Sequence, residues 1–174
     1  MQMGEGWNRM MEAAVELRHG LHRRPELGWQ EVETAQVIRA ELDAAGIPWR
    51  GCAQTGTVAT LAADAPGRHV ALRADIDALP IQEATGLDWA SQKQGMMHAC
   101  GHDGHMASLI GAAWWLKRHE SELPGPVSLL FQPAEEGGHG ARGMIEDGAL
   151  EGVDAIFGWH NWPAIPFGKA VCPD

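Results

Sequence analysis

Apolar residues near the start of the chain recur at the spacing of one helical face. This pattern predicts a helix over residues 7–21. A second periodic segment covers residues 29–45 and is followed by Gly46 and Pro48, both of which end helices. We therefore predict that the chain begins with two helices.

Short apolar runs further along the chain have the length of strands. Residues 57–62 and 69–74 flank the turn-forming stretch Asp64-Ala65-Pro66-Gly67, so we predict a hairpin of two strands. Residues 127–132, VSLLFQ, are short, apolar and bounded by prolines, which is typical of a strand buried on both faces. Residues 154–159 are predicted to form another strand.

Two more helices complete the predicted alternation. Residues 103–119 carry apolar side chains at helical spacing, and Asp103 is suited to cap the start of this helix. A short helix is predicted at residues 141–147, and residues 168–174 resemble the beginning of a further strand. Helices that alternate with buried strands indicate an α/β protein built in layers.

Composition and charge narrow the classes of function. The chain has 174 residues, of which 45% are hydrophobic, so about one domain with a real core is expected. Its 23 acidic and 13 basic residues give a formal charge of -10 without a Lys/Arg-rich run, which disfavours nucleic acid as a partner. The sequence contains neither a signal-like start nor an apolar stretch of about 20 residues, so we predict a cytoplasmic protein with no membrane partner.

The densest cluster of reactive side chains is His98-Ala99-Cys100-Gly101-His102-Asp103-Gly104-His105. Thiolate and imidazole are the preferred ligands of zinc and similar ions, and Gly101 relieves backbone crowding between Cys100 and His102. A single Cys or His is more often a small core residue or a hydrogen-bonded polar group. Their combination just before a helix favours metal binding.

Two further clusters follow predicted strands. Glu135 and Glu136 come directly after residues 127–132, and His160 follows residues 154–159. Ligands of open α/β sheets bind beyond the carboxyl ends of the strands, where one Glu can bind metal while the other transfers a proton. Taken singly, the Glu pair could be a solvated turn and His160 a structural residue. Convergence at one sheet edge favours a site.

Asp75 and Asp77 leave the end of the predicted strand at residues 69–74. Such carboxylates can fix the tautomer and direction of a histidine that binds metal. The alternative is a charged turn in which they pair with Arg73.

Four motifs in this order, RADIDALP, HACGHDGH, FQPAEEGGHGA and GWHNWP, resemble those of the M20 metallopeptidases. Within that family the resemblance is to the amidohydrolase branch, which includes hippurate hydrolases, N-acetyl-amino-acid deacetylases and plant auxin-conjugate hydrolases. It implies a three-layer α/β/α, zinc-peptidase-like catalytic domain with a mixed, mostly parallel sheet. It also implies two divalent ions, with zinc or manganese favoured over cobalt or nickel.

The resemblance assigns roles to six residues. Cys100, His102, Glu136 and His160 match metal ligands. Glu135 matches the general base, and Asp75 matches the acid that supports a ligand. The implied reaction is hydrolysis of N-acyl amino acids to a carboxylate and a free amino acid.

Members of the family are about twice as long as this chain. Residues 1–174 correspond to the N-terminal portion of the catalytic domain, whereas the lid domain, through which members form homodimers, and a last histidine ligand have no counterpart. We therefore expect little or no activity from residues 1–174 alone.

Three alternatives to amide hydrolysis of N-acyl amino acids stay open at this point. The first is a di- or carboxypeptidase of the same family, and the second is an inactive metal-binding fragment. In the third, Cys100 is a nucleophile activated by His102 or His105. The indoles of Trp159 and Trp162 fit either an aromatic acyl group or the core, so they do not select a substrate.

Overall fold

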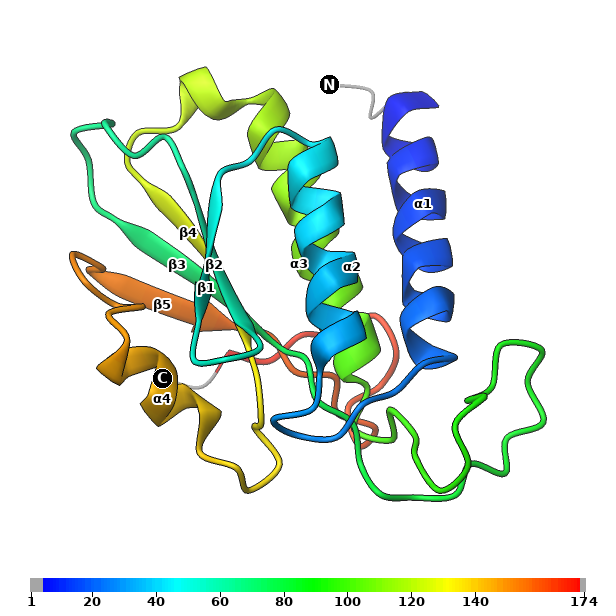
Figure 1. Cartoon of the computed structure of the whole chain (residues 1–174). Coiled ribbons are helices and arrows are strands. Elements are labelled where there is room, and N and C mark those ends of the chain that lie inside the picture. Colours follow the sequence, from blue (N-terminus) through cyan, green and yellow to red (C-terminus); the bar gives the residue numbers. More distant parts are fainter. Residues whose placement is uncertain (1–4, 173–174) are drawn as a thin grey trace.

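A five-stranded sheet of order β1-β2-β4-β3-β5 forms the centre of the computed structural model, which describes residues 5–172 (Figure 1). The strands are β1 (Trp49–Cys52), β2 (Gly56–Leu61), β3 (Val70–Asp75), β4 (Val127–Gln132) and β5 (Ala155–Gly158). The helices are α1 (Glu5–His22), α2 (Val32–Ala44), α3 (His102–Arg118) and α4 (Gly140–Glu146), with a short 3-10 turn, η1, at Glu120–Glu122. All four predicted helices are confirmed, and so are four of the five predicted strands.

The sheet is mixed, as predicted, with parallel and antiparallel pairs in equal share. β3 runs parallel to both β4 and β5, whereas the β1–β2 and β2–β4 pairs are antiparallel. β4 is buried along almost its whole length because it lies between β2 and β3. Its mostly apolar sequence suits this central place.

The predicted hairpin of residues 57–62 and 69–74 is wrong. Within the described part of the chain, β2 and β3 are separated by β4, to which both are hydrogen-bonded. The turn at residues 64–67 contacts the segment before β4, where Gly67 N–H donates to the Pro124 carbonyl at 2.8 Å. The hairpin that does form joins β1 to β2.

Helices cover both faces of the sheet. Helices α1, α2 and α3 share one hydrophobic core with β2, β3 and β4, which includes Ile38, Ile110 and Phe131. Helix α4 lies on the other face, where Met144 packs with Leu130 and Ala71 (Figure 1). The predicted three layers are therefore present.

The start of α2 differs from the prediction. Trp29 has a left-handed backbone, with φ of 66°, so a helix cannot run through it and α2 begins at Val32 instead. The carboxylate of Glu26 accepts hydrogen bonds from the N–H groups of Glu33 and Thr34 at 3.2 and 2.8 Å. Glu26 thus satisfies the first turn of this helix from outside it.

The prediction that Asp103 caps α3 is also wrong. The N-cap residue is Gly101, whose φ of 85° favours glycine, and Asp103 lies inside the first turn. The fully buried Asp103 carboxylate accepts hydrogen bonds from Arg18 and His22 of α1 at 3.0 and 2.9 Å. It joins two helices rather than capping one.

The predicted strand over residues 168–174 is absent in residues 168–172, and residues 173–174 lie outside the described part. β1, by contrast, was not predicted, because its sequence WRGC is mostly exposed and has no alternating pattern. None of the helices within residues 5–172 is long and apolar enough to cross a bilayer.

A buried ion-pair cluster links α1 to the start of α3. The ring of His22 lies between Asp103, 2.9 Å from Nδ1, and Glu83, 3.3 Å from Nε2. The hydrogen bond with Asp103 raises the pKa of His22, and this effect outweighs burial, which lowers it. Because both neighbours are acceptors, the charged form of the ring satisfies both.

This cluster predicts a pH-dependent stability difference. His22 has a raised pKa in the folded state, so its contribution is complete below the unfolded pKa of about 6.5 and is lost as pH rises through the folded value. Replacing His22 with Gln should lower the free energy of unfolding by about 2 kcal/mol at pH 6. Urea denaturation at pH 9 should show a smaller difference between the two proteins, and a difference independent of pH would contradict the charged assignment.

Candidate metal centre

The reactive clusters come together at one edge of the sheet. β3, β4 and β5 are parallel, so their carboxyl ends meet there, and α3 begins beside them. Asp75 ends β3, Glu135 and Glu136 follow β4, and His160 follows β5. His102, the first residue of α3, lies among them, so all six predicted site residues belong to one region.

His102 is the centre of this region. Its fully buried ring has Nδ1 at 2.8 Å from the carbonyl of Asp77, which can only accept, so Nδ1 carries the proton and Nε2 has a lone pair. Among residues 5–172, Nε2 has no hydrogen-bond partner. It faces the carboxylates of Asp75 and Glu135 at 3.8 Å and of Glu136 at 3.9 Å.

The electrostatic surroundings of His102 favour a cation. Burial lowers the pKa of His102. The hydrogen bond with Asp77 and the charges of Asp75 and Asp77 together raise this pKa by a larger amount, so the net shift is upward. A buried imidazole is thus held beside several carboxylates. Burial of such charges is costly unless positive charge balances them.

Cys100 and His160 form a second pair of donors. The Sγ atom of Cys100 lies 3.4 Å from Nε2 of His160. The Nδ1 atom of His160 lies 2.6 Å from the carbonyl of Asn161, so this ring, like His102, carries its proton on Nδ1 and offers Nε2. In the neutral form, both imidazoles therefore leave Nε2 available to bind a metal ion.

Three groups of potential ligand atoms, each within 4.8 Å of one another, share His102. They are Cys100 with His160, Asp75 with His105, and Glu135 with Glu136. Thiolate, imidazole and carboxylate donors together suit zinc, manganese and related divalent ions. The residues present therefore fit a divalent cation. The main evidence is the buried Nε2 of His102, which has no hydrogen-bond partner among residues 5–172.

The group of Asp75 and His105 was not predicted as a group. Oδ2 of Asp75 lies 3.4 Å from Nδ1 of His105, and both atoms are buried without a hydrogen-bond partner in residues 5–172. His105 also faces Asn161, whose Oδ1 is 2.7 Å from its Nε2. His105 follows His102 by three residues on α3, which puts both rings on one face of the helix. This spacing is the sequence feature that could have predicted the group.

Asp77 contacts a histidine, the role that the sequence suggested for Asp75 and Asp77, and it also contacts the backbone of Glu136. Its carbonyl holds His102, and its carboxylate accepts the N–H of Glu136 at 2.9 Å. Burial raises the pKa of Asp77. The hydrogen bonds from His102 and from the backbone of Glu136 lower this pKa by a larger amount, so the net shift is downward. Asp75, the predicted supporting acid, instead contacts Arg73 and faces the two rings.

Comparison with known proteins identifies the family of the chain. A family profile described as peptidase family M20/M25/M40 matches residues 71–173, which include every predicted ligand. The chain belongs to this family. The resemblance of the four motifs is thereby confirmed.

Two curated relatives of this M20 chain are named as a deacetylase and a hydrolase. N-acetyl-L-cysteine deacetylase from Bacillus subtilis is 52% identical over 155 residues, covering 88% of the chain and 37% of that protein. IAA-amino acid hydrolase ILR1-like 2 from Arabidopsis thaliana is 52% identical over 158 residues, covering 90% of the chain and 36% of that protein. The chain thus spans little more than a third of the length of these relatives.

A solved M20 structure has the same fold. The crystal structure of the Bacillus subtilis YXEP protein, described as a dinuclear metal binding peptidase, matches with a TM-score of 0.88 and 47% identity. The match covers 91% of this chain and 45% of that one. The predicted M20-type catalytic fold is therefore confirmed.

The indoles beside the M20 site are not core residues. Trp159 and Trp162 are 54% and 63% exposed. The ring of Trp159 lies edge-on to His105 at 5.1 Å between centroids, and Trp162 lies 6.2 Å from His160. Exposed aromatic rings offer apolar surface beside His105 and His160.

Proposed function

We propose that the protein carrying this sequence is a metal-dependent amidohydrolase of N-acyl amino acids. The buried, unpartnered Nε2 of His102, surrounded by carboxylates and next to the Cys100–His160 pair, carries this proposal. The proposed ligands are Cys100, His102, Glu136 and His160. Family membership and the names of the relatives support the reaction class.

The cations supply the electrophilic part of the chemistry, because a divalent ion polarises an amide carbonyl and lowers the pKa of water. We propose two ions, zinc or manganese, with cobalt or nickel as further possibilities. The description of the YXEP structure as dinuclear supports the number. A thiolate ligand favours zinc, while the mixture of imidazole and carboxylate also accepts manganese.

Glu135 performs the proton transfer in this proposal. Its side chain is 40% exposed, so it reaches solvent and substrate, and its Oε2 lies 3.8 Å from Nε2 of His102. Glu135 takes a proton from the attacking water and delivers it to the leaving nitrogen. The amide C–N bond breaks, a C–O bond forms, and the products are a carboxylate and an amine.

The proposed substrate class is N-acyl amino acids with small or aromatic acyl groups. N-acetyl-cysteine and indole-acetyl conjugates are named in the two relatives, and the exposed rings of Trp159 and Trp162 suit an aromatic group. We also propose a cytoplasmic location, in keeping with the unbridged thiols of Cys52 and Cys100, and a homodimer for the whole protein.

The test is an amide-cleavage assay of the protein at its natural length. N-acetyl-cysteine, hippurate and indole-acetyl-alanine are supplied with zinc or manganese, and the released amino acid is measured. We expect cleavage of at least one substrate, loss of cleavage with a chelator, and recovery on return of the metal. Cleavage that persists in the chelator, or metal-loaded protein that cleaves none of the three, would contradict the proposal.

The alternative in which Cys100 is the nucleophile predicts a reactive thiol. Burial, and then the neighbouring carboxylates of Glu136 and Glu135, raise the pKa of Cys100 to about 12 from its ordinary value of 9.0. At pH 8 the thiolate fraction is then about a thousandfold below that of an ordinary cysteine. The thiol of the metal-free protein is therefore expected to be a poor nucleophile.

We predict slow alkylation of Cys100 by iodoacetamide at pH 8 in the metal-free chain. The extent of labelling is measured by mass spectrometry of the digested protein, with the exposed Cys172 as the internal reference. Cys172 should be labelled first. Rapid labelling of Cys100, together with amide cleavage that ignores chelators, would favour the thiol mechanism.

A further inference from the structure

The segment before α2 contacts the loop that carries Glu135 and Glu136. We call residues 133–139 the acidic loop. The side chain of Glu31 is fully buried, and its Oε1 accepts the N–H of Ala134 at 2.8 Å. Its Oε2 accepts the hydroxyl of Thr55 at 2.6 Å. The residue directly before Glu135 is therefore held by a buried carboxylate.

The direction of the Glu31 side chain is unusual for its place in the chain. Glu31 is the N-cap residue of α2, yet its side chain makes no capping hydrogen bond within the described residues. Glu26 satisfies that helix end instead. A buried carboxylate is costly unless it is fully hydrogen-bonded, and this one is directed to the acidic loop and to the β1–β2 turn.

Trp29 makes the second contact with the acidic loop. Its indole N–H donates to the carbonyl of Gly138 at 3.0 Å. Trp29 itself has φ of 66°, and two residues of the loop, Ala134 and His139, have φ of 47° and 58°. A left-handed backbone costs a non-glycine residue about 1–2 kcal/mol, so packing and hydrogen bonds must hold these positions.

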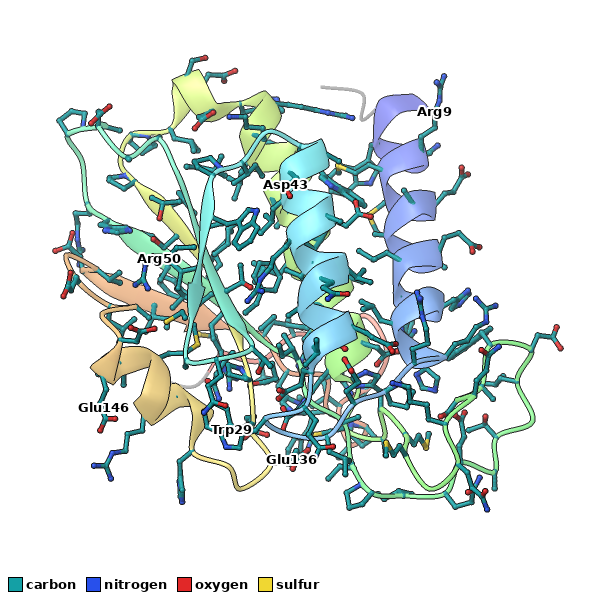
Figure 2. The ribbon with its side chains drawn as sticks, in the orientation of Figure 1. Arg9, Trp29, Asp43, Arg50, Glu136 and Glu146 are labelled. Atoms are coloured by element: carbon teal, nitrogen blue, oxygen red, sulfur yellow. The ribbon has the colours of Figure 1, made fainter. Side chains whose placement is uncertain are left out.

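The two segments approach so closely that glycine is required between them. A Cβ on Gly138 would lie 2.6 Å from Cβ of Ala134 and 2.9 Å from Nε1 of Trp29. A Cβ on Gly28 would lie 3.1 Å from Cα of Ala134. Figure 2 labels Trp29 and Glu136 at the same end of the molecule, far from Arg9.

Anchors therefore flank the two acids on both sides. Glu31 holds the N–H of Ala134, Asp77 holds the N–H of Glu136, and Trp29 holds the carbonyl of Gly138. Between these anchors the carboxylates of Glu135 and Glu136 face Nε2 of His102 at 3.8 and 3.9 Å. The loop has little freedom to move its acids away from the site.

We propose that Glu31 and Trp29 are positioning residues that hold Glu135 and Glu136 against His102. The roles of general base and ligand for these two acids rest on the proposed function. The competing explanation is that Glu31 only stabilises the fold through Thr55 and α2. The two explanations differ in what they predict for metal affinity and for the acidic loop.

The central variant is Glu31→Leu, which leaves the buried N–H of Ala134 without its acceptor. Zinc affinity, measured by calorimetric titration of the chain, should fall by about ten- to a hundredfold, the range for loss of a residue that orients a ligand. Hydrogen exchange at the amides of Ala134 and Glu136, followed by NMR, should become faster. Glu31→Gln should restore both, because its amide oxygen can accept from Ala134 while its NH2 group donates to Thr55.

The matched control is Glu26→Leu. It removes a second buried carboxylate from the same segment. The carboxylate of Glu26 accepts from the N–H groups of Glu33 and Thr34 in α2 and not from the acidic loop. We expect lower thermal stability with the zinc affinity and loop exchange of the wild type. An equal loss of zinc affinity in Glu26→Leu and Glu31→Leu would mean that general destabilisation causes the loss, and this result would overturn the proposal.

Other outcomes are also decisive. Unchanged zinc affinity and unchanged exchange in Glu31→Leu would overturn the positioning role. If Glu31→Leu does not fold, Trp29→Phe keeps an aromatic side chain but removes the indole N–H, and unchanged exchange at Glu136 in that variant would overturn the positioning role equally. Wild-type protein that binds none of zinc, manganese, cobalt and nickel would refute the proposed function, while the exchange of the two amides would still test the positioning.

Discussion

Glu135→Gln is expected to lower the turnover of N-acyl amino acids by about a hundredfold or more, within the usual range for loss of a general base. Glutamine has nearly the same shape, so the acidic loop keeps its anchors on Ala134 and Glu136. The amide cannot accept the proton of the attacking water. Metal content should therefore stay at the wild-type level while cleavage is lost.

The matched control for this variant is Glu146→Gln. Glu146 is an exposed carboxylate on α4 that pairs with Arg142 (Figure 2). Its replacement should change neither cleavage nor metal content. Wild-type turnover in Glu135→Gln would remove Glu135 from the proton transfer, and a parallel loss of metal and turnover would make it a ligand instead.

His102→Ala should cause the largest loss of metal affinity of any single substitution. His102 belongs to all three groups of potential ligands and is fully buried, so other ligands cannot replace its Nε2. Loss of a residue that merely orients a ligand costs about ten- to a hundredfold in affinity, and loss of the shared ligand should exceed a hundredfold. Zinc titration of the purified chain measures the effect.

His119→Ala is the control at the other end of α3. Its exposed ring stacks on Trp115 and lies far from the sheet edge that carries the site. Zinc affinity of this variant should equal that of the wild type. If His102→Ala retained tight zinc binding, the shared-ligand arrangement would be wrong, whatever its effect on stability.

The elements that the sequence predicted are those in which the local pattern decides the structure. Residues 127–132 are mostly apolar and form the central strand β4, and the periodic segment at residues 103–119 forms α3. The pairing of residues 57–62 with 69–74 failed because a turn signal describes only nearby residues. It cannot reveal that a distant strand inserts between two sequence neighbours.

The candidate site was predictable to the extent that its residues are clustered in the sequence. Cys100 and His102 share one motif, and the ends of parallel strands brought Glu136 and His160 to the same edge. The contact of Glu31 with Ala134 joins residues about a hundred positions apart, and residue 31 fell inside the helix predicted over residues 29–45. Such partners emerge only from the packed backbone.

The order of the strands also has a consequence for the synthesis of the protein. β2 and β3 each bond to β4, and residues 76–126 lie between β3 and β4. On the ribosome, neither strand can complete its hydrogen bonds until residue 132 has left the exit tunnel. We expect one unpaired edge on β2 and two on β3, whose other neighbour β5 also comes later in the chain, which makes the nascent chain slow to fold and dependent on chaperones.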